Sequence, residues 1–512
     1  MKRKRLTGLL LAGIMAVSII ACGTAEGNGE TAGTNGTTET AGTGDSGEVY
    51  TVKWVLPGNE PEDLPEIEDA LNKKLADDGM NLQVDIVRIP WDAWEQKTNL
   101  MLTTGEEFGL LHIMQDQGSV MSRGILYDLR EYLDKYPDLK GRFDEQAWSE
   151  VTTKDGQIVA VPAQWQVMQP LGQLSIRKDV LDKLDIPLPR TSEEVMEAAV
   201  KIKDYVEKET GQQAYYWTQS TKYPAEWLER TYDTYPFYVD RVNNLWKVDQ
   251  EGKVTSWFES EEFKKDAQYY REMYKNGLIS PDLLTKNEVW EVQNKGTVIM
   301  GDCYNWGTIK GLRDAGYPDA DLEFYYLNED ATRVLPLTIG NMNGIPQSCT
   351  NPEAVVKFLD WFYADASNVQ MVVYGIEGKH YNKVEGDEKK IEIIKDDAGM
   401  ALYQFDNWEV GYYPYSLFDT EEPEESIIQQ TTPLEEGTFV TSPIAGFIFN
   451  EEPVITEMAN LTNEVVSSMY PIKFGFVDYE EAYDGAIAKL KAAGLDKVLE
   501  EYQKQLNEYL GK

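Results

Sequence analysis

Hydrophobic and polar residues follow two different periods along the chain after residue 48. Residues 49–56, 82–89 and 109–114 are short runs of β-branched and apolar side chains, which is typical of strands. Residues 64–75 and 91–102, which lie between these runs, carry apolar side chains at helical spacing. Strands and helices that alternate in this way indicate a parallel sheet with helices on both faces, an α/β fold.

A second alternating unit follows a short strand at residues 158–161. Asp179 opens a helix, and residues 191–194 (Thr-Ser-Glu-Glu) resemble the capping box of the next one. The pattern further predicts a helical stretch from 126 to 132, a strand at 214–217, a hairpin at 246–257 around Glu251-Gly252, a helix at 261–276, a strand at 296–300, a helix at 355–362 and long helices within 484–510. We therefore predict two α/β lobes, with a chain that crosses between them more than once.

The N-terminal residues have the pattern of an export signal. Residues 2–5 are Lys-Arg-Lys-Arg, and residues 6–21 are almost wholly apolar but shorter than the ~20 residues of a membrane-spanning helix. Ile19, Ile20 and Ala21 lead into Cys22, a sequence that resembles the lipobox of bacterial lipoproteins. We predict a signal peptide at 1–21, lipid on Cys22, and a flexible Gly- and Thr-rich tether over 22–48.

Composition removes several classes of function. Cleavage before Cys22 would leave a formal net charge of −44, against −40 for the full sequence, which argues against a nucleic-acid partner. His112 and His380 are the only histidines, and Cys303 and Cys349 are the only cysteines after Cys22. This is little material for a zinc site or a Ser-His-Asp triad, so we expect no metal, no cofactor and no enzymatic activity. The apolar run around His112 predicts a structural residue within a strand. Whether Cys303 and Cys349 form a disulfide is left undecided.

Several stretches, in this order, resemble the carbohydrate-type family 1 extracellular solute-binding proteins of bacterial ABC importers. The stretches lie at residues 89–108, 274–279, 296–301, 351–354, 374–381 and 490–498. The resemblance implies two lobes joined by a hinge, a ligand held in the cleft between them, and a membrane permease with its ATPase as partners. We assign 49–165 plus about 322–375 to the first lobe, and 166–321 plus 376–512 to the second.

The chain departs from the family pattern at two positions. Gly109 stands where members commonly have an acidic residue, and Cys303 stands where many have a tryptophan. Tyr304 and Trp306 are close to Cys303 in the sequence, so which ring stacks on the ligand stays open.

A sugar site needs flat aromatic rings for the C–H faces and polar side chains for the hydroxyls. Ligands of open α/β sheets bind beyond the carboxyl ends of the strands, here the loops at 57–59, 90–94 and 115–117. The candidate binding residues are Trp91, Asp116, Gln164, Trp165, Trp217, Trp227, Asp302, Tyr304, Trp306 and Trp408. Packing in a core is the alternative for each tryptophan, and helix capping is the alternative for Asp116 and Asp302.

Two other functions remain as alternatives. One is a binding protein for peptides or another polar solute, which would favour charged anchors over flat rings. The other is a secreted glycosidase, which needs two carboxylates at a defined separation. With 88 Asp and Glu residues, such pairs are inevitable and indicate nothing. We expect a monomeric carbohydrate-binding lipoprotein on the outer face of the cytoplasmic membrane, with an oligosaccharide as ligand.

Overall fold

The computed structural model describes residues 49–512 except 115–117, 171, 219, 286–291, 293–294, 302–305, 338 and 398. The predicted signal peptide, the tether and Cys22 lie outside the described residues, as do Asp116, Asp302, Cys303 and Tyr304. Residues 48–512 form one unit by their internal contacts, and within it two hydrophobic cores surround two main sheets.

The first sheet contains the strands that the sequence predicts near the N-terminus. Its order is β2 (Leu82–Ile89), β1 (Tyr50–Pro57), β3 (Leu110–Met114), β13 (Asn341–Gly344) and β4 (Ala160–Pro162). β1 pairs in parallel with β2 and β3, as predicted, whereas β13 runs antiparallel to β3 and β4. The sheet is therefore mixed, because β13 enters it from a later part of the chain.

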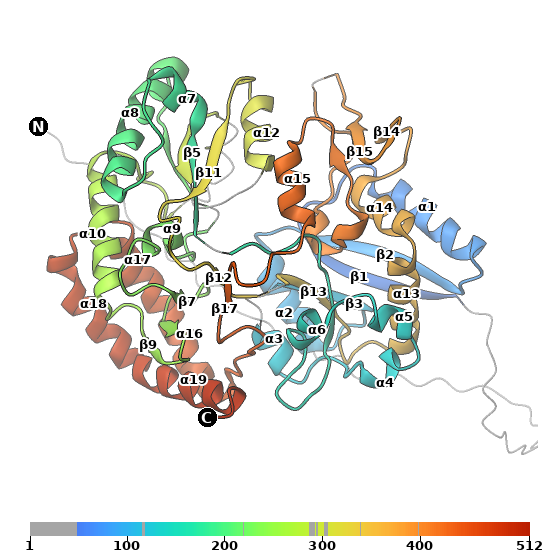
Figure 1. Ribbon diagram of the computed structural model, residues 1–512. Coiled ribbons are helices and arrows are strands. Elements are labelled where there is room, and N and C mark those ends of the chain that lie inside the picture. The colour runs from blue at the N-terminus through green and yellow to red at the C-terminus, as the bar shows by residue number, and fades with distance from the viewer. Residues whose placement is uncertain are drawn as a thin grey trace, which may run out of the picture. The chain divides into compact units, whose positions relative to one another are not determined.

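Helices pack around this sheet and enclose the first core (Figure 1). They are α1 (Leu64–Asp77), α2 (Trp94–Thr104), α3 (Gly118–Ser122), α4 (Arg130–Leu133), α5 (Pro137–Lys140), α6 (Glu145–Ser149), α13 (Pro352–Ala364) and α14 (Ala366–Tyr374). Phe358 and Phe362 of α13 meet the Trp54 ring of β1 edge to face, at centroid distances of 5.8 and 5.3 Å. The buried residues of α1 (Leu64, Ile67, Leu71, Leu75) keep the helical spacing seen in the sequence.

The second lobe is built on a sheet of order β11 (Leu322–Tyr326), β5 (Gln173–Arg177), β10 (Val298–Gly301) and β6 (Tyr215–Trp217). Its helices are α7 (Lys178–Lys183), α8 (Ser192–Thr210), α9 (Glu226–Glu229), α10 (Glu261–Lys275), α12 (Trp306–Asp314), α16 (Ile455–Glu464), the π-helix η5 (Val465–Met469), α17 (Tyr470–Lys473), α18 (Tyr479–Ala493) and α19 (Leu495–Tyr509). A smaller sheet joins β7 (Phe237–Val239), β8 (Trp246–Asp249) and β9 (Val254–Ser256), and β8 and β9 are the predicted hairpin. The capping box of α8 is also confirmed.

Lys473 of α17 ties the C-terminal helices to a loop of this lobe. Its ammonium is buried and donates to the carbonyls of Thr221 (2.8 Å) and Tyr223 (2.7 Å) and to Asn244 Oδ1 (2.8 Å). All three acceptors lie between β6 and β8.

The chain crosses between the lobes at three places. It leaves the first sheet after β4, returns between β11 and β13, and leaves again before η4 (Glu452–Val454). The last two crossings run together, because β12 (Val334–Leu335) pairs in parallel with β17 (Val440–Thr441). The elements between the second and third crossings are completed by β14 (Tyr381–Val384), β15 (Asp387–Ile393), η2 (Asn407–Glu409), η3 (Tyr413–Tyr415), β16 (Phe418–Asp419) and α15 (Glu424–Thr431).

The structure differs from the sequence prediction at several boundaries. β11 pairs with β5, so the return to the first lobe comes after residue 326 and not at about 322. Val410 belongs to the first core, although 376–512 was assigned to the second lobe. Leu126 forms an isolated bridge with Pro346, and the helix predicted from 126 begins only at Arg130. Cys349 is a buried free thiol 3.4 Å from the Tyr50 hydroxyl.

Two features are absent from the described residues. Among them, no helix has both the length and the apolar character needed to cross a membrane. In the same part of the chain, no group of three or more His, Cys, Asp or Glu side chains is arranged to hold a metal ion.

Candidate ligand-binding site

Two of the predicted tryptophans meet beyond the carboxyl end of the first sheet. Trp91 follows β2 and is 51% exposed, and Trp408 lies in η2 and is half-buried. Their ring centroids are 5.8 Å apart, with the planes tilted by 31°. We call this pair the aromatic platform. It lies at the edge of the sheet where open α/β folds bind ligands.

His112 of β3 packs against the Trp408 ring of the platform. Its ring meets Trp408 edge to face at 5.2 Å, and its Nε2 lies 3.1 Å from Asn341 Oδ1 on β13. Complete burial lowers the pKa of His112 to about 3, so the imidazole is neutral. His112 is therefore a structural strand residue, as its apolar neighbours in the sequence indicate.

A buried ion pair holds the loop that carries Trp408. The Arg88 guanidinium at the end of β2 donates through Nη1 to Glu409 Oε2, and both side chains are almost fully buried. Asn343 Nδ2 donates to the Glu409 carbonyl (3.1 Å), and Trp54 Nε1 donates to Asn343 Oδ1 (2.8 Å). The platform is thus connected to the core through charged and polar contacts.

Gln164 and Trp165 lie beside the same loop. The Tyr413 N–H donates to the Gln164 carbonyl (2.8 Å), and both predicted side chains are half-buried. A Cβ on Gly411 would lie 2.9 Å from the Cβ of Trp165 and 2.4 Å from the Asn407 carbonyl oxygen. The lack of a side chain at Gly411 lets the backbone of the Trp408 loop approach Trp165 closely.

The three tryptophans predicted from the second lobe are not part of this surface. Trp227 is completely buried in the second core, where it packs on Tyr269 at 5.6 Å. Trp217 and Trp306 are 2% and 8% exposed and share a small apolar cluster with Leu312. Because these rings are covered and none of them lines the pocket described below, we assign these three to packing in the structure as it stands.

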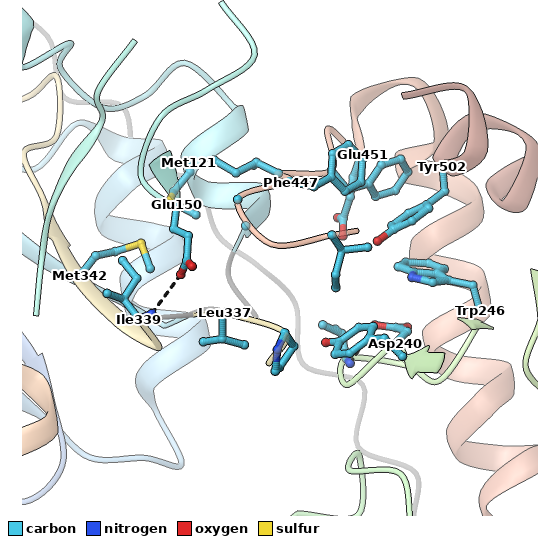
Figure 2. A pocket seen from close by; sticks show the side chains of 18 of the residues that line it. Met121, Glu150, Asp240, Trp246, Leu337, Ile339, Met342, Phe447, Glu451 and Tyr502 are labelled. Carbon is cyan, nitrogen blue, oxygen red and sulfur yellow. Dashed lines mark hydrogen bonds between the residues drawn. The ribbon is translucent and has the colours of Figure 1, made fainter. Parts of the chain in front are cut away.

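A pocket of ≈ 130 Å³ lies between the lobes, beside the two paired crossings (Figure 2). The first lobe and the crossings contribute Gly118, Met121, Glu150, Pro336, Leu337, Ile339, Met342, Ile444, Gly446, Phe447, Ile448 and Phe449. The second lobe contributes Tyr238, Asp240, Val242, Trp246, Glu451, Met458 and Tyr502. Lys222 and Glu95 form an ion pair between the lobes, at 3.9 Å.

The pocket combines packed rings with carboxylates. Tyr502 lies 4.2 Å from Trp246 and 4.9 Å from Phe449, measured between ring centroids. Glu150 Oε2 accepts from the Ile339 N–H (3.0 Å). Asp240 Oδ1 accepts from the Val242 N–H (2.9 Å), and its Oδ2 accepts from the N–H groups of Asn243 and Leu245 (both 3.1 Å). Burial raises the pKa of the Asp240 carboxyl.

Sequence reasoning missed every residue of this pocket. Tyr502 lies within the long helices predicted at 484–510, and nothing in their pattern indicates a binding residue. The sequence pattern around Trp246 predicts only the start of a hairpin. The one local signal was the closely spaced Phe447 and Phe449, which precede the predicted C-terminal helices.

Comparison with known proteins identifies the family to which the chain is similar. The family model for bacterial extracellular solute-binding proteins matches residues 62–369, and a domain of unknown function (DUF3502) matches residues 443–511. A carbohydrate ABC transporter substrate-binding protein of Streptococcus pneumoniae is 24% identical over 97% of this chain and 96% of its own. The polygalacturonan/rhamnogalacturonan-binding protein YtcQ of Bacillus subtilis is 23% identical over 96% of this chain and 97% of its own.

Solved structures share the fold. The N-glycan transport solute binding protein (NgtS) of S. pneumoniae, in complex with Man5GlcNAc, has a TM-score of 0.68 at 21% identity, over 90% of this chain and 99% of that protein. An HMO-binding, ABC-transporter-associated solute-binding protein from Bifidobacterium longum infantis has a TM-score of 0.64 at 17% identity, with the same coverage. These likenesses confirm the predicted two-lobe fold.

Proposed function

This chain belongs to the family of bacterial extracellular solute-binding proteins, and we propose that it captures a carbohydrate outside the cell for the permease of an ABC importer. Both relatives that match nearly the whole chain are carbohydrate-binding proteins by name, one of them of an ABC transporter. Neither is described as an enzyme, which supports a binding function for this chain.

The structural observation that carries the carbohydrate assignment is the aromatic platform of Trp91 and Trp408. An exposed indole costs free energy in water unless a ligand covers it, and the C–H face of a sugar ring is such a cover. Trp165 and Gln164 lie beside the loop that carries Trp408 and could add a further ring and an amide to the site. We propose these four residues as the first-lobe half of the carbohydrate site.

The N-terminal sequence supports a location at the membrane surface. The basic residues, the apolar run and Cys22 together are the basis for proposing that the mature chain begins at a lipidated cysteine. Two acyl chains on one cysteine would hold the protein stably at the bilayer, whereas one would not. We further propose that the protein acts as a monomer, with the permease as its partner.

A thermal-shift screen of the purified protein tests the proposal. The ligands are neutral and acidic oligosaccharides of several linkages, with a set of oligopeptides as the control. A ligand at 100 times its Kd stabilises the folded protein by ~2.7 kcal/mol. Stabilisation by peptides with no response to any oligosaccharide would contradict the carbohydrate assignment and favour the peptide alternative.

A further inference from the structure

The pocket between the lobes is lined in part by aromatic rings and carboxylates. Its second wall comes largely from residues 443–511, the segment that matches a domain of unknown function. Ile444, Phe447, Phe449, Glu451, Met458 and Tyr502 all belong to that segment. Figure 2 shows Met121, Glu150 and Met342 on the wall that faces them.

The aromatic side chains of this wall are fixed by one another. Tyr502 contacts Trp246, Phe449 and Phe447, at centroid distances of 4.2, 4.9 and 5.2 Å. The Trp246 ring also meets Phe449 edge to face at 5.9 Å. Rings that pack in this way keep their positions before a ligand arrives, which lowers the entropic cost of binding.

The charged residues that line the pocket have one sign. Glu150, Asp240 and Glu451 are its ionisable acids apart from two tyrosines, and no Lys, Arg or His belongs to the lining among the described residues. Arg123 and Lys222 act on Glu451 and Asp240, respectively, through their charge, and both lie outside the lining.

The three carboxylates differ in the backbone hydrogen bonds that hold them. Glu150 accepts one backbone N–H and Asp240 accepts three, so both are held in place by the fold. Glu451 follows the aromatic stretch and points toward the pocket in Figure 2. A carboxylate in this position accepts hydrogen bonds from hydroxyl groups. A second carboxylate would be repelled, because carboxylates are bound by cations such as Arg and Lys.

We propose that residues 443–511, together with Asp240, Trp246 and Glu150, form a subsite for an uncharged sugar unit and exclude uronic acids. The proposal rests on the carbohydrate function proposed above. The cavity is smaller than the roughly 300–1,000 Å³ that enclose a whole small molecule, so it receives one end of a longer glycan. The C-terminal segment then determines which glycans are transported.

Calorimetric titration with matched ligands tests the proposal. The probes are Man5GlcNAc, a neutral galacto-oligosaccharide and the oligogalacturonide of the same length as the latter. We expect at least one neutral glycan to bind ~10-fold or more tightly than the oligogalacturonide, the size of one charge-assisted contact. An oligogalacturonide that binds more tightly than both neutral glycans would overturn the subsite but leave the carbohydrate function. No binding of any saccharide would overturn the carbohydrate function itself.

Two matched variants locate the effect. Glu451→Gln keeps the shape of the side chain and removes its charge, and we expect it to reduce the preference for the neutral glycan by ~10-fold. Glu452→Gln makes the same charge change at the next residue, which is exposed and outside the lining, and should leave the preference within twofold. Equal effects of the two variants, with unchanged melting temperatures, would refute the role of the pocket.

Discussion

The buried pair of Arg88 and Glu409 leads to a specific prediction about how the aromatic platform is held. The Arg88→Met substitution keeps the unbranched stem, which still packs near Phe405, but removes the cation. The guanidinium is 4.7 Å from the Phe405 ring, and the Arg88 and Glu409 side chains are 2% and 0% exposed. The substitution therefore leaves a carboxyl group without its cation in a place that water does not reach.

Breaking a buried ion pair by removing one partner costs about 3–5 kcal/mol of the free energy of unfolding. The loss should depend on pH. Burial raises the pKa of Glu409 and the charge of Arg88 opposes that rise, so without Arg88 this pKa rises further. A carboxyl group whose pKa is raised in the folded state lowers the free energy of unfolding as pH increases from its unfolded-state pKa to its folded-state pKa. The variant should therefore lose more of its free energy of unfolding at pH 9 than at pH 5.

Urea denaturation at pH 5, 7 and 9 measures this loss, with Arg130→Met as the control. Arg130 pairs with Asp128 at the surface, where the two side chains are 51% and 30% exposed, so its loss should cost only about 0–1 kcal/mol. Because η2 carries both Glu409 and Trp408, glycan affinity should fall along with stability. A loss below ~1 kcal/mol for Arg88→Met, or one that shrinks as pH increases, would refute the role given to this pair.

Three further predictions concern the aromatic residues Trp408 and Trp306, the buried carboxyl group of Asp266 in α10, and Cys22. Truncating an aromatic anchor costs ~2 kcal/mol of binding free energy, so Trp408→Ala should weaken glycan binding roughly 30-fold by calorimetry and leave the melting curve unchanged. Trp306 is buried, so Trp306→Ala should instead lower the free energy of unfolding by about 3–5 kcal/mol. Burial raises the pKa of Asp266 to about 8, so Asp266→Asn should increase the melting temperature most at pH 8, and an equal change at pH 5 would contradict this. Cys22→Ala should move the protein from the membrane fraction to the soluble fraction, and unchanged retention would disprove lipid anchoring.

Local features of the fold were predictable because neighbouring residues determine them. Thr191 accepts from the Glu194 N–H at 3.2 Å, and Glu194 returns the contact, as the capping-box sequence requires. Gly252 has a φ of +80° in the turn of the predicted hairpin. The antiparallel entry of β13 was not predictable, because the period of a strand does not reveal which strand it pairs with.

The candidate site was predictable only in part for the same reason. Trp91 and Trp408 are 317 positions apart, and only the preference of ligands for the carboxyl ends of strands connected the first of them with a site. Trp227 is also a candidate from the sequence, yet its side chain is fully buried. The pocket joins Glu150, Asp240 and Tyr502 from distant parts of the sequence, and the local pattern around each of them indicates only structural packing.

The three hydrogen bonds of Lys473 have a consequence for protein engineering. The segment at 443–511 is matched as a domain of its own. The Lys473 ammonium in this segment nevertheless donates to two carbonyls and one side-chain amide between β6 and β8. Trp246 of β8 also packs on Tyr502 of the segment. A chimera that receives this segment alone from a relative would confront it with foreign loop partners. A chimera meant to transfer the proposed subsite should therefore exchange residues 221–249 and 443–511 together.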